Sequence, residues 1–146
     1  MNAVNATQEY LAAEVERADP LRRVALLHEH ATRCVGRAVR HIERREMAQA
    51  HSAFVKAKNI VLHFLASIPD GDDSEVAANL RGLFQYTYQK LVEGNLRKDP
   101  QCADAALEVL RSLGEGWAEL DTQRRSAAAG QAADDEPPTT GVSLEA

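Results

Sequence analysis

Residues 74–95, SEVAANLRGLFQYTYQKLVEGN, constrain the fold of this chain more than any other stretch of the sequence. Apolar and small side chains recur there at alternating steps of three and four, at Val76, Leu80, Leu83, Thr87 and Leu91. This spacing places them on one face of an α-helix, where they form a single apolar stripe. The stretch is therefore predicted to be a helix that packs one face against other helices.

Three further segments show the same one-sided pattern between clear boundary signals. Asp19-Pro20 and Asp99-Pro100 each combine a good N-cap residue with a proline suited to the first helical position. Residues 69–72 read Pro-Asp-Gly-Asp, a strong turn signal, and Ser74, Asp72 or Asp73 is expected to cap the helix that follows. The expected helices span residues 20–45, 47–67, 74–95 and 100–120.

Four helices of about 20 residues each reach about 30 Å, and short connections force consecutive members to run antiparallel. The predicted fold is all-α, an antiparallel up-down four-helix bundle over residues 19–120. Residues 1–18 form a short amphipathic segment, too short to hold a helix alone, so it either dangles or docks on the bundle. Residues 121–146 lack an apolar stripe and are predicted to be a disordered tail.

Composition excludes several classes of function. The 146 residues fit one domain, and a net charge of −5 argues against nucleic acid as the main partner. No apolar run approaches the roughly 20 residues of a membrane span. The first residues contain neither an early Lys or Arg nor an apolar core of a signal peptide, so a cytoplasmic location is expected. Cys34 and Cys102 lie far apart in sequence and are expected to be small buried thiols; a disulfide between them is the alternative, which no motif supports.

Catalytic motifs are absent from the sequence. None of the five histidines has a glutamate three residues earlier, the spacing that a ferritin-like metal bundle requires. The sequence also lacks the zinc-protease, phosphate-loop, dinucleotide and haem-attachment motifs. His28 lies on a predicted apolar face, where a hydrogen-bonded core histidine is a simpler interpretation than a ligand. We therefore expect no enzyme activity, no catalytic residue, no metal and no other cofactor.

Several short motifs follow one another in order along the chain. They are residues 10–15 (YLAAEV), residues 18–20 (ADP), Lys56-Ala57 with Ile60 and Leu65, residues 75–80 (EVAANL), residues 83–86 (LFQY), Leu91 with Asn95-Leu96, Asp99-Pro100, and Leu110, Leu113 and Trp117. Each motif is weak alone because helical bundles are rich in Leu and Ala. The ordered series, from Tyr10 to about Leu120, resembles the FliS family of flagellar secretion chaperones.

This resemblance implies a function. FliS-like proteins bind the C-terminal segment of flagellin in the cytoplasm, prevent its premature polymerisation and assist its delivery to the flagellar type III export gate. An amphipathic segment gains stability by laying its apolar face along grooves between helices. The expected flagellin-binding residues are Tyr10, Val15, Phe64, Leu65, Asn79, Leu80, Leu83, Phe84, Tyr86, Leu91 and Asn95. The segment with Tyr10 and Val15 is expected to cover part of the groove and to be displaced.

Some of these residues have simpler interpretations. Leu80, Leu83 and Leu91 lie on the stripe and are expected to serve the core first. Tyr86 lies off the stripe and combines an apolar ring with a hydroxyl, which favours a role in the groove. Asn79 and Asn95 fit contacts with partner backbone or local turn caps equally well.

The sequence departs from the family pattern in three places. Residues 27–30 read Leu-His-Glu-His where many members have Leu-Tyr, Arg45-Glu46 replaces a usual Gly-Asp, and Phe84 stands where Tyr is common. The first departure is expected to alter partner preference or groove shape without threatening the bundle.

Two other functions are compatible with a four-helix bundle. The first is a helical adaptor or regulator that binds another amphipathic partner helix. The second is a metal or haem enzyme, against which the missing inward ligands count. A homodimer is also compatible with the sequence.

Overall fold

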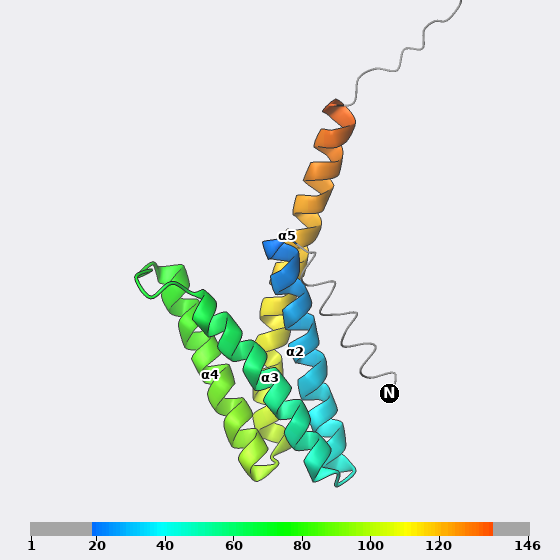
Figure 1. Cartoon of the computed structure of the whole chain (residues 1–146), viewed down its shortest axis with the longest axis vertical. Coiled ribbons are helices and arrows are strands. Elements are labelled where there is room, and N and C mark those ends of the chain that lie inside the picture. Colours follow the sequence, from blue (N-terminus) through cyan, green and yellow to red (C-terminus); the bar gives the residue numbers. More distant parts are fainter. Residues whose placement is uncertain (1–18, 136–146) are drawn as a thin grey trace, which may run out of the picture.

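Four helices form the part of the chain that the structure, a computed structural model, describes, namely residues 19–135. They are α2 (Pro20–Glu43), α3 (Met47–Ser67), α4 (Glu75–Arg97) and α5 (Pro100–Asp135). The predicted all-α bundle is confirmed. In Figure 1 the helices run up and down in sequence order, joined by short connections at alternating ends.

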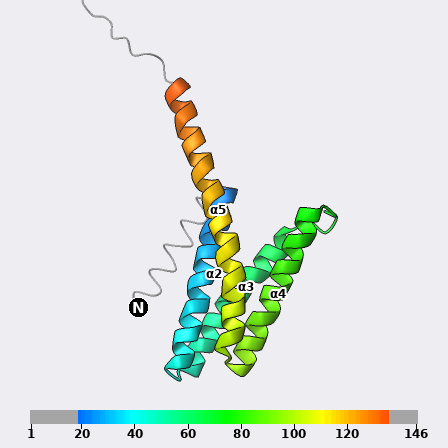
Figure 2. The same cartoon turned by 180° about the vertical axis from the view of Figure 1, so that it is seen from behind.

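Each helix packs against two of the others. The contacting pairs are α2 with α3, α2 with α5, α3 with α4, and α4 with α5, so that α2 faces α4 and α3 faces α5 across the bundle diagonals. Both cartoon views show that the pair α2 and α5 and the pair α3 and α4 converge at one end of the bundle (Figures 1 and 2). This end holds the α2–α3 and α4–α5 connections. At the other end, the tip of the α3–α4 hairpin leans away from α2 and α5.

The helix starts follow the predicted capping signals. The Asp19 carboxylate accepts a hydrogen bond from the backbone N–H of Arg22 at 3.0 Å, and Ser74 Oγ accepts one from the N–H of Ala77 at 3.2 Å. These contacts satisfy N–H groups that the first turn of a helix leaves unpaired. Of the three candidate caps for the third helix, Ser74 is therefore the one used.

Arg45 lies in the turn between α2 and α3, where the family resemblance led us to expect glycine. Its φ of 60° lies in the left-handed region, which glycine adopts most readily. The backbone N–H groups of Arg45 and Glu46 donate to the carbonyls of Ile42 and His41, which closes the turn. A residue with a Cβ thus occupies a left-handed backbone position, at a conformational cost that glycine would not have.

The core changes in character along the bundle. At the converging end, the core combines small residues from all four helices with the Phe54 ring; the small residues are Ala38, Ala50, Gly94 and Ala103. A Cβ on Gly94 would lie 3.3 Å from Phe54 Cε1. At the diverging end, several rings pack together. The ring centroids of His28 and Phe64 are 4.1 Å apart in a stacked arrangement, and those of Phe64 and Phe84 are 5.2 Å apart. The size of these rings matches the greater separation of the helices there.

The apolar stripe of α4 is rotated relative to the predicted one. Its buried residues are Ala77, Phe84, Thr87, Leu91 and Gly94. Val76 and Leu83, which the sequence pattern placed on the stripe, are exposed. Of the predicted stripe, Thr87 and Leu91 are fully buried and Leu80 is half-buried. Two apolar side chains that were predicted to lie in the core, Val76 and Leu83, are thus on the surface.

Helix α5 extends further than predicted. The sequence pattern placed its end near Leu120, whereas the helix continues to Asp135. Asp121 explains the first part of the extension, because its buried carboxylate pairs with Arg22 of α2 and with Arg125, each at 3.3 Å. Arg124 pairs with Asp19. Beyond Arg125, residues 126–134 are all exposed, and the helix there depends on the intrinsic propensity of its Ala-rich sequence. Residues 1–18 and 136–146, including the predicted N-terminal segment, lie outside the described residues.

Two truncations separate these parts of α5. Deleting residues 127–146 is expected to change the melting temperature by less than about 2 °C, since the described part of that stretch buries no side chain. Deleting residues 121–146 removes the buried Asp121 and its ion pairs and is expected to lower the melting temperature by about 3–6 °C. Thermal unfolding followed by circular dichroism measures both. Equal melting temperatures for the two truncated chains would show that Asp121 does not fasten α5 to α2.

Candidate partner-binding surfaces

Helix α4 exposes apolar side chains on both of its flanks. Leu83 and Val92 are nine residues apart, a separation of about two and a half helical turns. They therefore point from opposite flanks of α4. The exposed members are Val76, Leu83, Tyr86, Val92 and Leu96, with Leu96 81% and Val76 68% exposed. Exposed apolar side chains grouped on one element are typical of binding surfaces.

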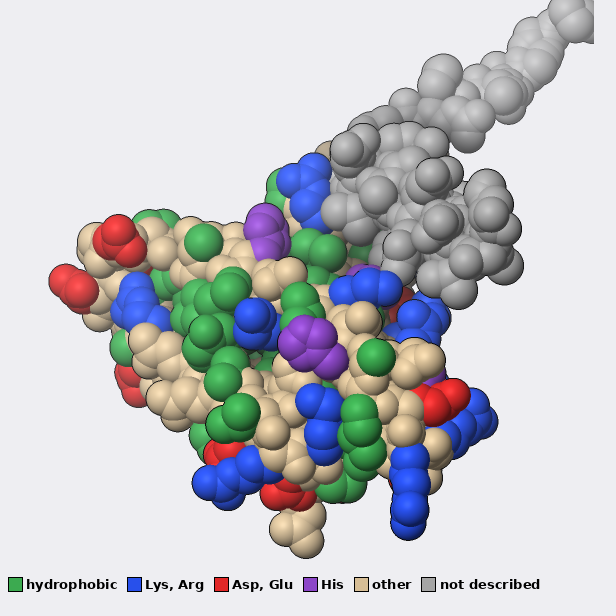
Figure 3. Space-filling view, turned by 60° about the horizontal axis from the view of Figure 1, so that its bottom comes forward, with side chains coloured by type: hydrophobic (Ala, Val, Ile, Leu, Met, Phe, Trp, Pro, Cys, Tyr) green, Lys and Arg blue, Asp and Glu red, His purple; other side chains and the backbone are tan. Residues whose placement is uncertain are grey.

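The first surface is a groove between α3 and α4, here called the α3–α4 groove. It has a volume of about 370 Å³, and its lining residues are His51, Phe54, Lys58, Leu91, Val92, Asn95, Leu96 and Lys98. Leu62, also exposed, lies one turn beyond Lys58 on the same flank of α3. Figure 3 shows hydrophobic side chains gathered on the side of the bundle where α3 and α4 lie, with cationic side chains and histidines among them. The groove thus combines an apolar floor with a basic rim.

The second surface lies on the opposite flank of α4 and is here called the α4 outer strip. It consists of Val76, Asn79, Leu83 and Tyr86, spaced as neighbours on one helix face. Tyr86 is 42% exposed, and the Lys90 ammonium lies 5.7 Å from its ring centroid. The Asn79 side chain is exposed and has no hydrogen bond among the residues the structure describes. The strip therefore offers apolar contact and a free amide to a partner.

The expected binding residues separate into exposed and buried groups. Leu83, Tyr86 and Asn79 lie together on the α4 outer strip. Phe64, Phe84 and Leu91 are buried in the core, where none is more than 5% exposed. Leu65 and Leu80 are partly buried and pack against that core. Tyr10 and Val15 lie outside the described residues. A partner at the surface would reach the exposed group directly and the buried group only through rearrangement.

Asn95 has partners within the bundle. Its amide nitrogen lies 3.0 Å from His51 Nδ1 of α3, and its side-chain oxygen accepts a hydrogen bond from Lys98 Nζ at 2.8 Å. Lys98 is the C-cap of α4 and adopts a left-handed backbone conformation. Of the two roles left open by the sequence, Asn95 fills the local one in this structure. The contact fixes the end of α4 beside the α3–α4 groove.

His28 lies at the centre of the aromatic cluster and is completely buried. Burial lowers the pKa of its imidazole to about 4. A hydrogen bond of 3.0 Å between Nδ1 and the Val24 carbonyl acts in the opposite direction and raises the pKa, but by less. The ring is thus neutral at pH 7, with Nδ1 donating to the carbonyl. Nε2 has no partner among the described residues, and neither has the buried Nε1 of Trp117, 6.3 Å away by ring centroids. The arrangement fits the predicted core histidine.

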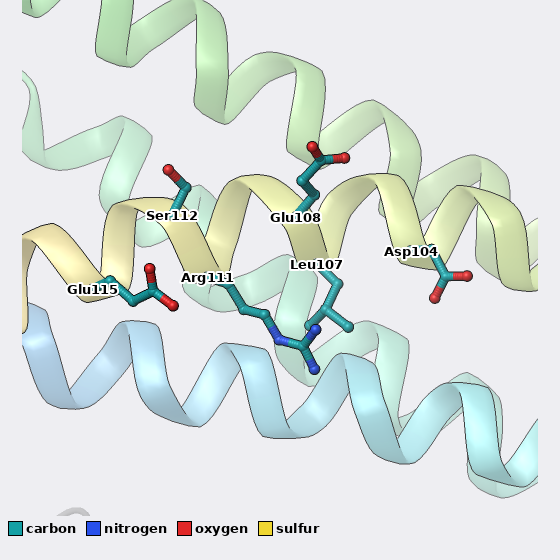
Figure 4. A pocket seen from close by; sticks show the side chains of 6 residues that line it. All are labelled: Asp104, Leu107, Glu108, Arg111, Ser112 and Glu115. Atoms are coloured by element: carbon teal, nitrogen blue, oxygen red, sulfur yellow. The ribbon is translucent and has the colours of Figure 1, made fainter.

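The depression on α5, the possible metal ligands and the two cysteines do not form a site. A depression on α5 has Asp104, Glu108 and Glu115 around it, but Figure 4 shows Glu108 and Ser112 pointing to one side of the helix and Leu107 and Arg111 toward α2. These side chains do not converge on one point. Within residues 19–134, no three His, Cys, Asp or Glu side chains gather to hold a metal ion. Cys34 and Cys102 are free and buried, and burial raises the pKa of both thiols.

Sequence periodicity did not identify part of these surfaces. Val92, Leu96 and Leu62 lie off the predicted stripes, and Val76 was assigned to the core. A usable signal existed, because Val92 and Leu96 are apolar residues one helical turn apart on a flank that the stripe leaves free. No helix among the described residues is long and apolar enough to cross a bilayer.

A four-helix bundle with exposed apolar surfaces on both flanks of one helix is typical of proteins that bind a partner through helical surfaces. Comparison with known proteins specifies the class. The family model described as "Flagellar protein FliS" matches residues 3–124, and the chain therefore belongs to the FliS family. The resemblance stated from the sequence motifs is confirmed.

Curated relatives agree with this assignment. The chain is 27% identical to the flagellar secretion chaperone FliS of Salmonella typhimurium over 114 residues, which cover 77% of this chain and 84% of the relative. It is 26% identical to the flagellar secretion chaperone FliSB of Pseudomonas aeruginosa over 121 residues, covering 80% of this chain and 96% of the relative. The family is thus one of flagellar secretion chaperones.

Proposed function

We propose that this protein is a cytoplasmic export chaperone that binds the C-terminal segment of flagellin, prevents its premature polymerisation and assists its delivery to the flagellar export apparatus. The observation that carries the proposal is the apolar surface on both flanks of α4 in a member of the FliS family. In this account the protein has no catalytic group and acts by covering a surface of its partner.

The two α4 surfaces suit an amphipathic segment. Such a segment cannot bury its apolar face alone, and ordering it on a partner costs about 2–5 kcal/mol or more. Val92 and Leu96 in the α3–α4 groove, together with Leu83 and Tyr86 on the α4 outer strip, provide apolar area on two sides of one helix. A segment that crosses α4 would use both surfaces. Wide contact of this kind offsets the cost of ordering.

Polar groups at the two surfaces can fix the orientation and register of the bound segment. Lys58 and Lys98 lie on the rim of the α3–α4 groove, and the free amide of Asn79 lies on the outer strip. Donors at these points suit acidic side chains or the exposed backbone carbonyls at the C-terminal end of a bound helix. The apolar residues would supply affinity, and the polar residues would fix the register.

A double substitution tests this assignment. Leu83→Ala combined with Tyr86→Ala is expected to weaken binding of the flagellin C-terminal segment by about tenfold or more, because it removes the two largest side chains of the outer strip. Isothermal titration calorimetry with the isolated segment measures the effect. Both residues are exposed, so helicity and melting temperature should remain close to those of the parent chain.

Leu120→Ala provides the matched control, since Leu120 is 48% exposed but lies on α5. We expect its affinity for the segment to stay within about twofold of the parent chain. If the double substitution also left the affinity unchanged, the outer strip would play no part in binding.

A further inference from the structure

Cationic side chains line a second groove, between α2 and α3, on the flank of α3 that faces away from α4. We call it the basic groove. It is lined by Arg37, Arg40 and His41 of α2, by Arg44 at the C-cap of α2, and by Gln49, Ser52 and Lys56 of α3. It has a volume of about 500 Å³. It shares no lining residue with the α3–α4 groove.

The residues of the basic groove form two regular rows. Arg37, Arg40 and Arg44 follow one another at steps of three and four, and Gln49, Ser52 and Lys56 do the same on the neighbouring helix. This spacing keeps each row on one helix face. Cys34 and Ala53, both small and buried, lie between the rows. A polypeptide in the groove would therefore have hydrogen-bond donors on both sides and little bulk beneath it.

The positive charges of the groove are not neutralised within the described part of the chain. Arg37, Arg40, Arg44 and Lys56 are exposed and have no ion pair among residues 19–134. The Glu46 carboxylate, at the end of the groove, pairs with His41 at 3.0 Å. A chain with a net charge of −5 thus keeps a cluster of unpaired cations in one groove.

A neighbouring histidine responds to this cluster. The pKa of His30 is lowered first by burial and then by the charges of Arg37, Lys56 and Arg33. The cluster therefore acts as a positive field at the wall of the groove.

Helix-dipole complementarity explains only part of the cluster. Arg40 lies in the last turn of α2 and Arg44 is its C-cap, where cations are favourable. Lys56 lies in the middle of α3, and Arg37 lies before the last turn of α2. The field of a helix end falls off within one turn, so these two positions need another explanation.

We propose that the basic groove binds an acidic segment of a partner polypeptide, with its carboxylates paired to the arginine row and Lys56. Charge complementarity determines the chemistry of the occupant. A polypeptide is favoured over nucleic acid because no Phe, Tyr or Trp lines the groove for base stacking, and its one aromatic ring, the His41 imidazole, is paired with Glu46. This site lies outside the two surfaces proposed for flagellin and can be tested without flagellin.

The probe is a fluorescein-labelled helical peptide of about four turns, built from Ala and Gln with Glu at alternating steps of three and four. A second peptide carries Gln in place of every Glu. Fluorescence anisotropy with the full chain at low and moderate salt measures affinity. We expect the Glu peptide to bind, the Gln peptide not to bind, and the affinity to fall as salt increases.

Charge-reversal variants locate the site. Arg37→Glu combined with Lys56→Glu is expected to weaken binding of the Glu peptide by about tenfold or more. Arg97→Glu combined with Arg111→Glu changes the net charge by the same amount at exposed positions outside both grooves and should leave affinity within about twofold. Equal losses in both double variants would overturn the proposal, and so would equal binding of the Glu and Gln peptides. Displacement of the Glu peptide by millimolar inorganic phosphate would assign the groove to a small anion and overturn the proposal. Displacement by a single-stranded oligonucleotide at a concentration below that of the peptide would assign it to nucleic acid and also overturn the proposal.

Discussion

Replacing Phe84 by alanine is expected to lower the free energy of unfolding by about 3–5 kcal/mol. Phe84 is only 4% exposed, and its ring packs against Phe64 and His28 where the helix pairs diverge. The lost ring leaves a cavity that neighbouring rings cannot fill without moving. Chemical denaturation followed by circular dichroism measures the loss.

Tyr86→Ala is the matched control for this change. Tyr86 lies two residues further along α4 but is exposed on the outer strip. Its replacement is expected to change the free energy of unfolding by less than about 1 kcal/mol. Similar losses for both variants would show that the rotation of α4 described here is wrong.

Acid is expected to destabilise the bundle through His28. The pKa of this imidazole is about 4 in the folded chain and about 6.5 when it is exposed. Between about pH 4 and pH 6.5, His28 is therefore protonated in the unfolded chain and neutral in the folded chain. From this group alone, stability is fully present above about pH 6.5 and is lost as the pH falls toward 4, by about 3 kcal/mol in total.

His28→Phe isolates this effect from the carboxylates that also titrate in acid. The phenyl ring can keep the stack on Phe64 but carries no proton, so the free energy of unfolding should fall less between pH 7 and pH 4.5 than in the parent chain. Urea denaturation at both pH values gives the difference. Parallel losses in parent and variant would mean that His28 is protonated in the folded state.

The sequence predicted most of the fold because local signals mark the helix boundaries. Asp19 and Ser74 cap the helices that follow them, and the second predicted helix matches α3 from Met47 to Ser67. Each signal depends on side-chain oxygen atoms that satisfy backbone N–H groups one turn away. Such contacts are local, and a sequence pattern can therefore reveal them.

The rotation of α4 could not be predicted in the same way. Val76 and Ala77, like Leu83 and Phe84, are adjacent apolar pairs, and periodicity alone cannot decide which member of each pair faces the core. The divergence of the helix pairs decides it, because the wider end has room for the Phe84 ring between Phe64 and His28. This is a property of the whole bundle.

The exposure of the expected binding residues could be predicted only in part, for the same reason. Tyr86 lies off either version of the stripe and is exposed, but on the α4 outer strip and not in the α3–α4 groove, so its role in binding stays a prediction. Phe64 and Phe84 match family motifs but are buried, since a motif shows which residues recur and not which way they face. Leu96 was missed as a surface residue because it was counted only within a motif. The extension of α5 was missed because Asp121, a polar residue, fastens it to α2.

Binding of full-length flagellin, compared with flagellin that lacks its C-terminal segment, tests the central claim most directly. Each flagellin is co-expressed with the tagged parent chain, purified by the tag and analysed for a stoichiometric complex by light scattering. We predict a complex of one chaperone with one full-length flagellin, and none with the truncated flagellin. Equal recovery of both flagellins, or of neither, would contradict the account.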